Sequence, residues 1–326
     1  MVANNTELEL AADTLREWAL DESLKRRVLA QPALARAAQR VARRYTAGMT
    51  IESAIAAIAA GVSRGHLGSI DFVGESARDV ETAKLASGVF LEVVEGIRAS
   101  SLPSTVSLDL SHVGSVIDYG LGLAHATEIA IAAEKSGIPV IISAEGSDRT
   151  DITLDIYDAL ASEHSRVGIT LQARLHRTPS DLDRVLEHPG IIRIVKGSFL
   201  ETDNVAYRRE SPELTSTYLE LSRRTIDANH AMSIATHDEK LVAALISEYG
   251  DILKSPIFEF EMLLGLGTRL LDELHADGYR TREYVIFGNE WWLYVLNRIA
   301  EHPDRIITAL ADLREVGREG GSRAPT

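Results

Sequence analysis

Two cations interrupt a stretch of sequence that otherwise has the composition of a buried strand. Arg193 and Lys196 lie three residues apart within the β-branched segment Ile191–Gly197. Side chains alternate between the two faces of a strand, so this spacing predicts that Lys196 lies at or beyond the end of the strand. Burying an unpaired cation costs several kcal/mol, so we expect an anionic or strongly accepting ligand nearby, such as a phosphate-bearing cofactor. An ion pair with Glu259 or Glu261 is the competing interpretation.

A second set of residues follows one face of a predicted helix near the end of the chain. Trp291, Tyr294, Arg298 and Glu301 recur at the i, i+3, i+7 and i+10 positions of one helical stripe. The two aromatic residues alone would be typical of ordinary packing. The arginine and the carboxylate on the same face favour the wall of a ligand site.

Composition limits the chemistry that these residues can perform. The 326 residues are 45% hydrophobic and 25% charged, which is typical of a folded chain. They include no cysteine, so disulfides, thiolate metal sites and iron–sulfur clusters are excluded, and any redox chemistry requires a bound cofactor. The net charge of −14 disfavours nucleic-acid binding. Because we find neither a long apolar run nor a signal-peptide pattern, we expect a soluble, cytoplasmic protein with no integral membrane segment.

The predicted secondary structure changes near residue 65, from helices alone to strands that alternate with helices. The first sixty residues have a helical pattern, with Thr50 as a predicted N-cap and Gly61 as a predicted helix end. Further on, β-branched runs alternate with amphipathic helical segments, one of which is predicted to begin with Thr178 and Asp181 as its capping pair. The predicted strands are Ile70–Gly74, Thr105–Ser111, Pro139–Ala144, Gly168–Ala173, Ile191–Lys196, Met232–Thr236, Ile257–Met262 and Glu283–Phe287.

Eight strands that alternate with helices over roughly 250 residues are typical of a (β/α)8 barrel. We therefore predict an α/β fold with a TIM-type barrel at residues 63–316, an N-terminal helical arm at 1–62 and a disordered tail at 317–326. A doubly wound open sheet also alternates, but it usually has fewer strands, and no Gly-rich fingerprint follows the first strand here.

In a barrel of this kind the active site lies at the carboxyl ends of the strands. The residues at these positions are strongly polar, which favours a site there. For Glu75, His237 and Asp238, which stand where helix caps belong, a purely structural role is equally open. The polar positions are Glu75, Asp109, Ser143, Glu145, Gln172, Arg174, Arg193, Lys196, Thr236, His237, Asp238, Glu259, Glu261 and Tyr284.

In their order along the chain, several of these segments resemble the proline dehydrogenases, FAD-dependent (β/α)8 barrels preceded by a helical arm. The resemblance runs through most of residues 65 to 305, and the ordered set of motifs is highly specific. The matching segments are Asp71–Glu75, Leu171–Ala173, Arg193–Phe199, Asn204–Tyr207, Ile234–Glu239, Phe258–Leu263, Tyr284–Gly288 and Asn297–Glu301.

The resemblance implies an FAD site. Arg193 would approach the flavin N5, where a cation stabilises the reduced flavin, and Gln172 would hydrogen-bond the ring edge. Thr236 and His237 would meet the adenosine-diphosphate portion, and Glu301 the ribityl chain. The residues that would line the cofactor are Val195, Lys196, Gly197 and Ser198. The implied reaction is hydride removal from a carbon that bears nitrogen, which leaves an imine.

The substrate end departs from the family pattern. Where family members carry two adjacent arginines on the last barrel helix, this chain has Asn297 and Arg298, and Asp109 replaces a lysine on the second strand. Ser143 replaces an acidic residue after the third strand. Each charge-assisted hydrogen bond lost is worth roughly 1.5–3 kcal/mol, so we expect a substrate other than proline itself.

The resulting hypothesis is a flavin-dependent enzyme that oxidises an amino acid or amine, such as a hydrazine-type or N-substituted amino acid or an amine with an added cationic group. Arg298 would hold a carboxylate, and Asp109 would receive a protonated nitrogen or orient the amine. Arg193, Asp109 and Tyr284 are the predicted catalytic residues. The residues predicted to contact the substrate are Asp109, Ser143, Leu263, Tyr284, Tyr294, Asn297 and Arg298.

Three alternatives stay open at this point. The first is a proline dehydrogenase that tolerates these changes and forms 1-pyrroline-5-carboxylate. The second is a metal-dependent barrel hydrolase, which the ten scattered histidines do not favour because no metal-binding motif occurs; we predict no metal site. The third is a non-catalytic homologue. The electron acceptor could be a quinone, oxygen or a soluble carrier, and the Arg-rich segment 25–44 is a candidate contact surface for a homo-oligomer.

Overall fold

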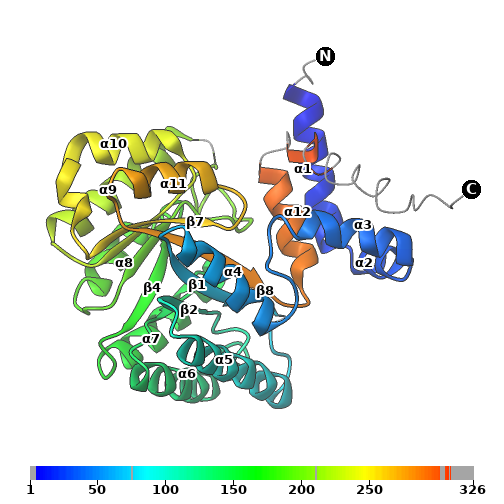
Figure 1. Ribbon diagram of the computed structural model, residues 1–326, viewed down its shortest axis with the longest axis horizontal. Helices are drawn as coiled ribbons and strands as arrows, with labels where there is room; N and C mark the ends of the chain where they lie inside the picture. Colours follow the sequence, from blue (N-terminus) through cyan, green and yellow to red (C-terminus); the bar gives the residue numbers. More distant parts are fainter. Residues whose placement is uncertain (1–4, 75, 210, 302–304, 308, 310–326) are drawn as a thin grey trace, which may run out of the picture.

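The computed structural model describes residues 5–74, 76–209, 211–301, 305–307 and 309. Within these residues the chain forms a closed barrel whose strands, β1 to β8, pair in sequence order and in parallel (Figure 1). The predicted barrel is confirmed, and the strand ends differ from the predicted ones by at most three residues. The strands are β1 (Leu67–Phe72), β2 (Ser104–Leu108), β3 (Val140–Ile142), β4 (Val167–Gln172), β5 (Ile192–Val195), β6 (Met232–Ala235), β7 (Phe258–Leu263) and β8 (Thr281–Phe287).

The inside of the barrel is unusually polar. In many such barrels the interior is filled by layers of branched apolar side chains. Here Ser69, Ser107 and Thr170 surround the guanidinium of Arg193. The alternate residues of the same strands, such as Val106, are fully buried in the apolar core. On β1, β2 and β5 the alternation thus places polar side chains in the lumen and apolar ones on the outer face.

Helices cover the outer face in the order expected of the fold (Figure 1). One predicted boundary is wrong: Thr178 is the first residue of α8 and not its cap. Its hydroxyl donates to the carbonyl of Gln172 at 2.6 Å, and Asp181 binds Arg177. The covering helices are α5 (Val80–Ser100), α6 (Tyr119–Lys135), α7 (Thr150–Ala161), α8 (Thr178–Val185), α9 (Pro212–Asp227), α10 (Glu239–Tyr249) and α11 (Thr268–Ala276), with short 3-10 turns η1 at 147–149 and η2 at 250–254.

Helix α4 (Ile51–Ser63) packs on β1 and β8, although it belongs to the predicted arm. The predicted N-cap Thr50 is confirmed, but the helix continues past Gly61 to Ser63. Gly61 is buried because the helix lies close to β8: a Cβ there would lie 3.0 Å from a carboxylate oxygen of Glu283. This glycine permits close packing and does not end the helix.

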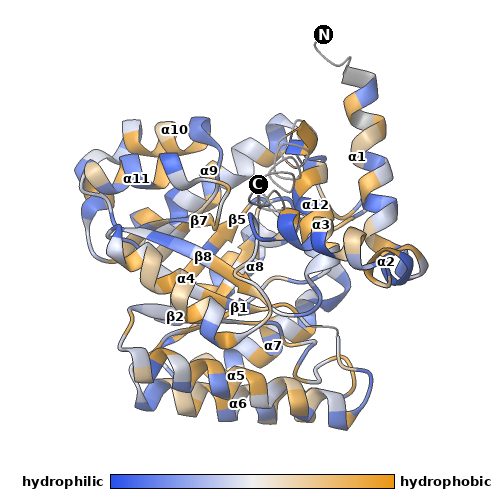
Figure 2. Ribbon diagram, turned by 45° about the vertical axis from the view of Figure 1, so that its right-hand side comes forward, coloured by the Kyte–Doolittle hydropathy of each residue, from blue (hydrophilic) through white to orange (hydrophobic). Residues whose placement is uncertain are grey.

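Three further N-terminal helices pack with the last helix, away from the main core. They are α1 (Asn5–Leu20), α2 (Glu22–Leu29) and α3 (Pro32–Ala42), and the last helix is α12 (Trp291–Glu301). Helix α1 runs along α12 (Figures 1 and 2). A second apolar cluster between these helices includes Leu15, Tyr45 and Trp292. The helical content of the first sixty residues is confirmed. The arm and barrel boundaries stay predictions, and the predicted tail lies outside the described residues.

Among the described helices, none combines the length and the apolar character that a membrane span requires.

Candidate active site

A cavity of about 2020 Å³ lies at the carboxyl ends of the strands, with α12 and α1 forming part of its wall. Small-molecule pockets usually measure about 300–1,000 Å³, so this one has room for a dinucleotide-sized cofactor together with a small substrate. Every residue predicted to contact the cofactor or the substrate lines it, and their individual roles stay predictions. These residues are Asp109, Ser143, Gln172, Arg193, Val195, Lys196, Gly197, Ser198, Thr236, His237, Leu263, Tyr284, Tyr294, Asn297, Arg298 and Glu301. Trp291 of the predicted helical stripe does not line it, because it packs in the second apolar cluster.

Arg193 lies at the floor of the cavity, where the protein itself binds the guanidinium. Glu261 accepts hydrogen bonds from Nε at 2.7 Å and from Nη2 at 2.8 Å, and both side chains are almost fully buried. Ser107 and Ser69 accept from Nη1 at 3.0 Å and Nη2 at 3.1 Å. Burial works against the charge, but Glu261, Tyr284 and Glu259 together outweigh it, and the pKa of Arg193 is raised above its usual value. The expectation that Arg193 needs an anionic ligand is therefore wrong, and the competing ion pair is found.

Tyr284 extends this buried network towards β1. The guanidinium carbon of Arg193 lies 4.9 Å from the Tyr284 ring centroid, and the Tyr284 hydroxyl donates to Asp71 Oδ2 at 2.8 Å. Burial, reinforced by repulsion from Asp109, raises the pKa of Asp71 well above its usual range. Burial also raises the pKa of Tyr284, so the phenol stays protonated as a donor. The second oxygen of Asp71, Oδ1, is buried and has no hydrogen-bond partner among the described residues.

Asp109 and Ser143 occupy adjacent positions because each directly follows a strand, and Leu108 pairs with Ile142 in the register of β2 and β3. The nearest cationic candidate is His112, whose Nε2 lies 3.7 Å from Asp109 Oδ2. Burial raises the pKa of Asp109 although His112 opposes the shift.

Glu145, two residues beyond Ser143, is by contrast fully engaged. Its Oε1 accepts from the backbone N–H of Ser111 at 2.8 Å, and its Oε2 binds Arg149 at 2.6 Å. Glu145 is therefore neutralised, whereas neither Asp71 nor Asp109 has an arginine or lysine within salt-bridge distance among the described residues.

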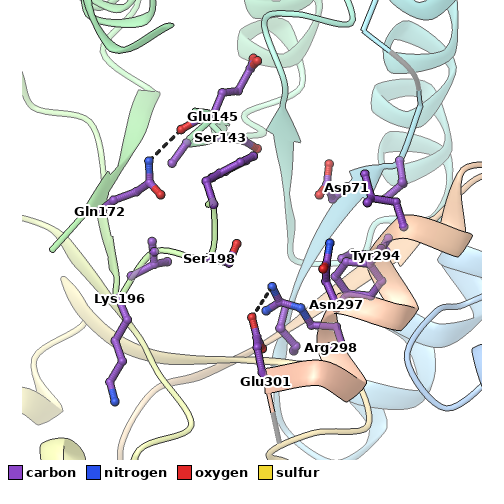
Figure 3. Close-up of a pocket in the computed structure, with 18 of the residues that line it drawn as sticks. Asp71, Ser143, Glu145, Gln172, Lys196, Ser198, Tyr294, Asn297, Arg298 and Glu301 are labelled. Carbon is purple, nitrogen blue, oxygen red and sulfur yellow. Dashed lines mark hydrogen bonds and ion pairs between the residues drawn. The ribbon is translucent and has the colours of Figure 1, made fainter. Parts of the chain in front are cut away.

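The adjoining wall, formed by the ends of β4 and β5, has the features of a cofactor cradle. Gly197 has φ +102°, and a Cβ there would lie 2.8 Å from Arg174 and 3.0 Å from Gln172 Oε1. Gln172 is held in place because its Nε2 donates to the carbonyl of Glu145 at 2.8 Å (Figure 3). Exposed main chain next to a fixed amide suits a flat heteroaromatic ring, so the residues fit a flavin.

Lys196 and the end of β6 continue this wall towards the rim. Lys196 follows β5, as predicted, and its Nζ lies 2.7 Å from Asp238 Oδ2. His237 Nε2 accepts from the backbone N–H of Leu263 at 3.0 Å, which leaves the ring proton on Nδ1. Both cations predicted to contact the cofactor thus have protein partners as well.

Helix α12 contributes the third wall. Arg298 Nη2 lies 2.6 Å from Glu301 Oε1, and its guanidinium carbon lies 5.5 Å from the Tyr294 ring centroid. Arg298 Nε and the Tyr294 hydroxyl are buried without hydrogen-bond partners among the described residues. Asn297 and Tyr294 lie on the same side of the cavity as Asp71 (Figure 3). Two unused polar groups on a cavity wall are typical of a ligand site.

Sequence analysis missed several residues of the cavity. Asp71 lies near the carboxyl end of β1, which is where site residues of a barrel are expected. It was not predicted because the strand was expected to begin three residues later, at Ile70, which placed Asp71 near its start. Arg16 of α1 and Arg209 of the loop before α9 also line the cavity, and Arg16 donates to the carbonyl of Ala300 at 3.3 Å. No sequence pattern indicated them. Burial and repulsion from Arg16 lower the pKa of Arg209, although Glu301 opposes the shift.

The fold and the site define a (β/α)8-barrel enzyme whose cavity lies at the carboxyl ends of the strands. The part of the chain that the structure describes holds no cluster of three or more His, Asp or Glu placed to bind a metal. The chain belongs to the proline dehydrogenase family, whose profile matches residues 54–298. Members of this family are flavin-dependent oxidoreductases that act on CH–NH donors, and this chain is such an enzyme.

Curated relatives of similar length support the family. Proline dehydrogenase 2 of Bacillus subtilis (strain 168) is 32% identical over 250 residues, which cover 76% of this chain and 82% of the relative. The proline dehydrogenase of Deinococcus radiodurans is 32% identical over 271 residues, covering 81% of this chain and 86% of the relative.

Solved structures share the fold. A crystal structure of proline utilization A (PutA) from Bdellovibrio bacteriovorus, inactivated by N-propargylglycine, matches with a TM-score of 0.77 at 17% identity. That match covers 98% of this chain but only 40% of the PutA chain. A PutA structure from Bradyrhizobium japonicum (mutant D778Y) matches with a TM-score of 0.68 at 20% identity, covering 83% of this chain and 33% of that one.

Proposed function

We propose that the protein binds FAD and oxidises the C–N bond of a small amino acid to an imine. The carbon would lose a hydride and the nitrogen a proton, so that the amino acid gives up two electrons. One observation carries this proposal: a flavin-sized cradle and a half-buried arginine, Arg298, whose Nε has no hydrogen-bond partner among the described residues, line the same cavity. A bound flavin would supply the two-electron acceptor for the hydride.

The cradle residues would hold the cofactor along one wall. Gly197 would let the main chain approach the ring system, and Gln172 would hydrogen-bond its edge from a fixed position. Because Glu261 neutralises Arg193, this ion pair would present an oriented dipole to the cofactor and little net charge. Lys196, Thr236 and His237 lie further out along the same wall, which supports a role towards the phosphate and adenosine portions.

The substrate would lie between this cradle and α12. Arg298 Nε has no protein partner among the described residues and could donate to a substrate carboxylate. Tyr284, Tyr294 and Leu263 would exclude water around the reacting carbon. Hydride loss requires a neutral amine, so flavin reduction should rise with pH through the pKa of the bound amine. A flat pH profile would count against this mechanism.

L-Proline is the first candidate substrate, because the curated relatives are named proline dehydrogenases and cover most of this chain. An amino acid other than proline is the second candidate. It is supported by Asp109 and Asn297, which stand where the family resemblance expects a lysine and an arginine.

Anaerobic flavin reduction tests the proposal. The purified protein, reconstituted with FAD if necessary, would be mixed with L-proline and with a panel of other amino acids. Bleaching of the flavin absorbance by at least one of them supports the function, and bleaching by low concentrations of proline identifies the first candidate. A protein that cannot bind FAD, or whose flavin no amino acid reduces, contradicts it.

A further inference from the structure

The substrate end of the cavity contains two carboxylates that the protein leaves without a strong partner. Asp71 is the last residue but one of β1, Asp109 follows β2, and both line the cavity. Asp71 accepts a hydrogen bond from the neutral Tyr284 hydroxyl, and Asp109 Oδ2 lies 3.7 Å from His112 Nε2. The other acidic residues nearby are already paired, since Glu145 binds Arg149 and Glu261 binds Arg193.

A buried atom without a partner, and not only the charge of the pair, points to a ligand. Asp71 is only 8% exposed, and its Oδ1 has no hydrogen-bond partner among the described residues although it lines the cavity. Ser143 is buried next to Asp109 in the strand register, and its hydroxyl lowers the pKa of Asp109 as a hydrogen-bond donor. A buried acceptor without a donor is costly, so Asp71 Oδ1 is typical of a site that a donor group completes.

The electrostatics agree with this geometry. Burial raises the pKa of both Asp71 and Asp109, and the repulsion between them adds to the shift of Asp71. A cation placed between them would relieve both effects. A neutral ligand would leave the repulsion in place.

We propose that Asp71 and Asp109 form a subsite for a second, positively charged nitrogen of the substrate. The inferred substrate class is an amino acid with a cationic side chain or ring substituent, whose carboxylate binds Arg298. This inference rests on the proposed function and takes its second candidate, an amino acid other than proline.

The cationic nitrogen must differ from the one that is oxidised. Two carboxylates stabilise an ammonium and would raise its pKa, whereas hydride loss needs a neutral amine with a free lone pair. A single nitrogen held by this pair would therefore resist oxidation. Separate positions for the two nitrogens remove this conflict.

Matched ligand pairs test the inference on the FAD-loaded protein. We would compare 4-amino-L-proline with 4-hydroxy-L-proline, and L-ornithine with L-norvaline, each pair differing mainly in one ammonium group. Dissociation constants would come from calorimetry or from the flavin spectrum, with reduction rates measured separately. One charge-assisted hydrogen bond corresponds to about 10- to 100-fold in affinity, so at least one amino member should bind about 10-fold or more tightly than its partner.

Two variants test whether the preference for the amino member depends on Asp109. Asp109→Asn keeps the shape and should remove most of the preference for the amino member. Asp251→Asn is the matched control, because it removes the same charge outside the cavity lining. Asp251 is an exposed residue of η2, and its carboxylate lies 2.9 Å from Lys254 Nζ. This variant should keep the preference.

Several results would overturn the inference. One is equal or tighter binding of the neutral member of both pairs in the wild-type protein, which requires no variant. Another is an unchanged preference in Asp109→Asn. If Asp109→Asn slows reduction by all substrates equally and leaves the binding ratio intact, Asp109 acts on the reacting amine instead. Failure of the proposed function has a different signature, because then no ligand reduces the flavin whatever the binding data show.

Discussion

Replacing Glu261 by glutamine removes the counter-charge of Arg193 while keeping the shape of the side chain. The two side chains are 1% and 3% exposed, and two hydrogen bonds of 2.7 and 2.8 Å join them. Breaking a buried ion pair by removing one partner typically costs about 3–5 kcal/mol, because the remaining charge stays buried. Ser69 and Ser107 hold other N–H groups of Arg193, but neutral hydroxyls cannot balance its charge.

The free energy of unfolding of the cofactor-free protein would be measured by denaturant titration, so that flavin binding does not contribute. The control is Glu248→Gln, whose partner Arg223 is 2.9 Å away in an ion pair that is about two-fifths exposed. An exposed pair of this kind is worth under about 1 kcal/mol. Equal losses in the two variants would refute the assignment of Glu261 as the counter-ion that holds Arg193 at the floor of the cavity.

Three further predictions concern the cofactor, the substrate and pH. Gly197→Ala should lower the flavin content of the purified protein, measured as the flavin-to-protein absorbance ratio, because the φ of +102° and the contact with Arg174 leave no room for a Cβ; unchanged flavin content would argue against the cradle. Arg298→Met should raise the KM for the amino acid by about 10- to 100-fold while the protein still binds flavin, and an unchanged KM would exclude Arg298 as the carboxylate ligand. The raised pKa of Asp109 means that its contribution to stability is complete below its unfolded pKa of about 3.9 and is lost as the pH rises through its folded pKa. Asp109→Asn should therefore melt at a higher temperature than the wild type at pH 7, with the difference shrinking towards pH 4; a less stable variant at pH 7 would contradict this electrostatic account.

The barrel was predictable because its signal is local. Alternating β-branched runs and amphipathic segments are visible within short windows, and the eight-strand count follows from them. The same holds for Lys196, since the spacing from Arg193 alone places it past the strand end. The predicted site residues at the strand ends line one cavity because the carboxyl ends of parallel strands meet at one end of a barrel, and the predicted residues of α12 share one helical face that completes its wall.

The partners of these residues were not predictable, because they depend on register. Glu261 lies 68 positions from Arg193 and meets it only across β6, and the Tyr284 bond to Asp71 requires β8 to close against β1. Gly61 had the pattern of a helix stop, but close packing against Glu283 explains it. Nothing local could indicate that α1 would bring Arg16 to the cavity.

The most direct test of the account is an anaerobic titration of the FAD-loaded protein with amino acids, followed by the flavin absorbance. The account predicts about one FAD per chain and stoichiometric bleaching by an amino acid, with an imine as the product. A protein that binds no flavin, or whose bound flavin stays oxidised in the presence of proline and of every cationic analogue, would contradict it.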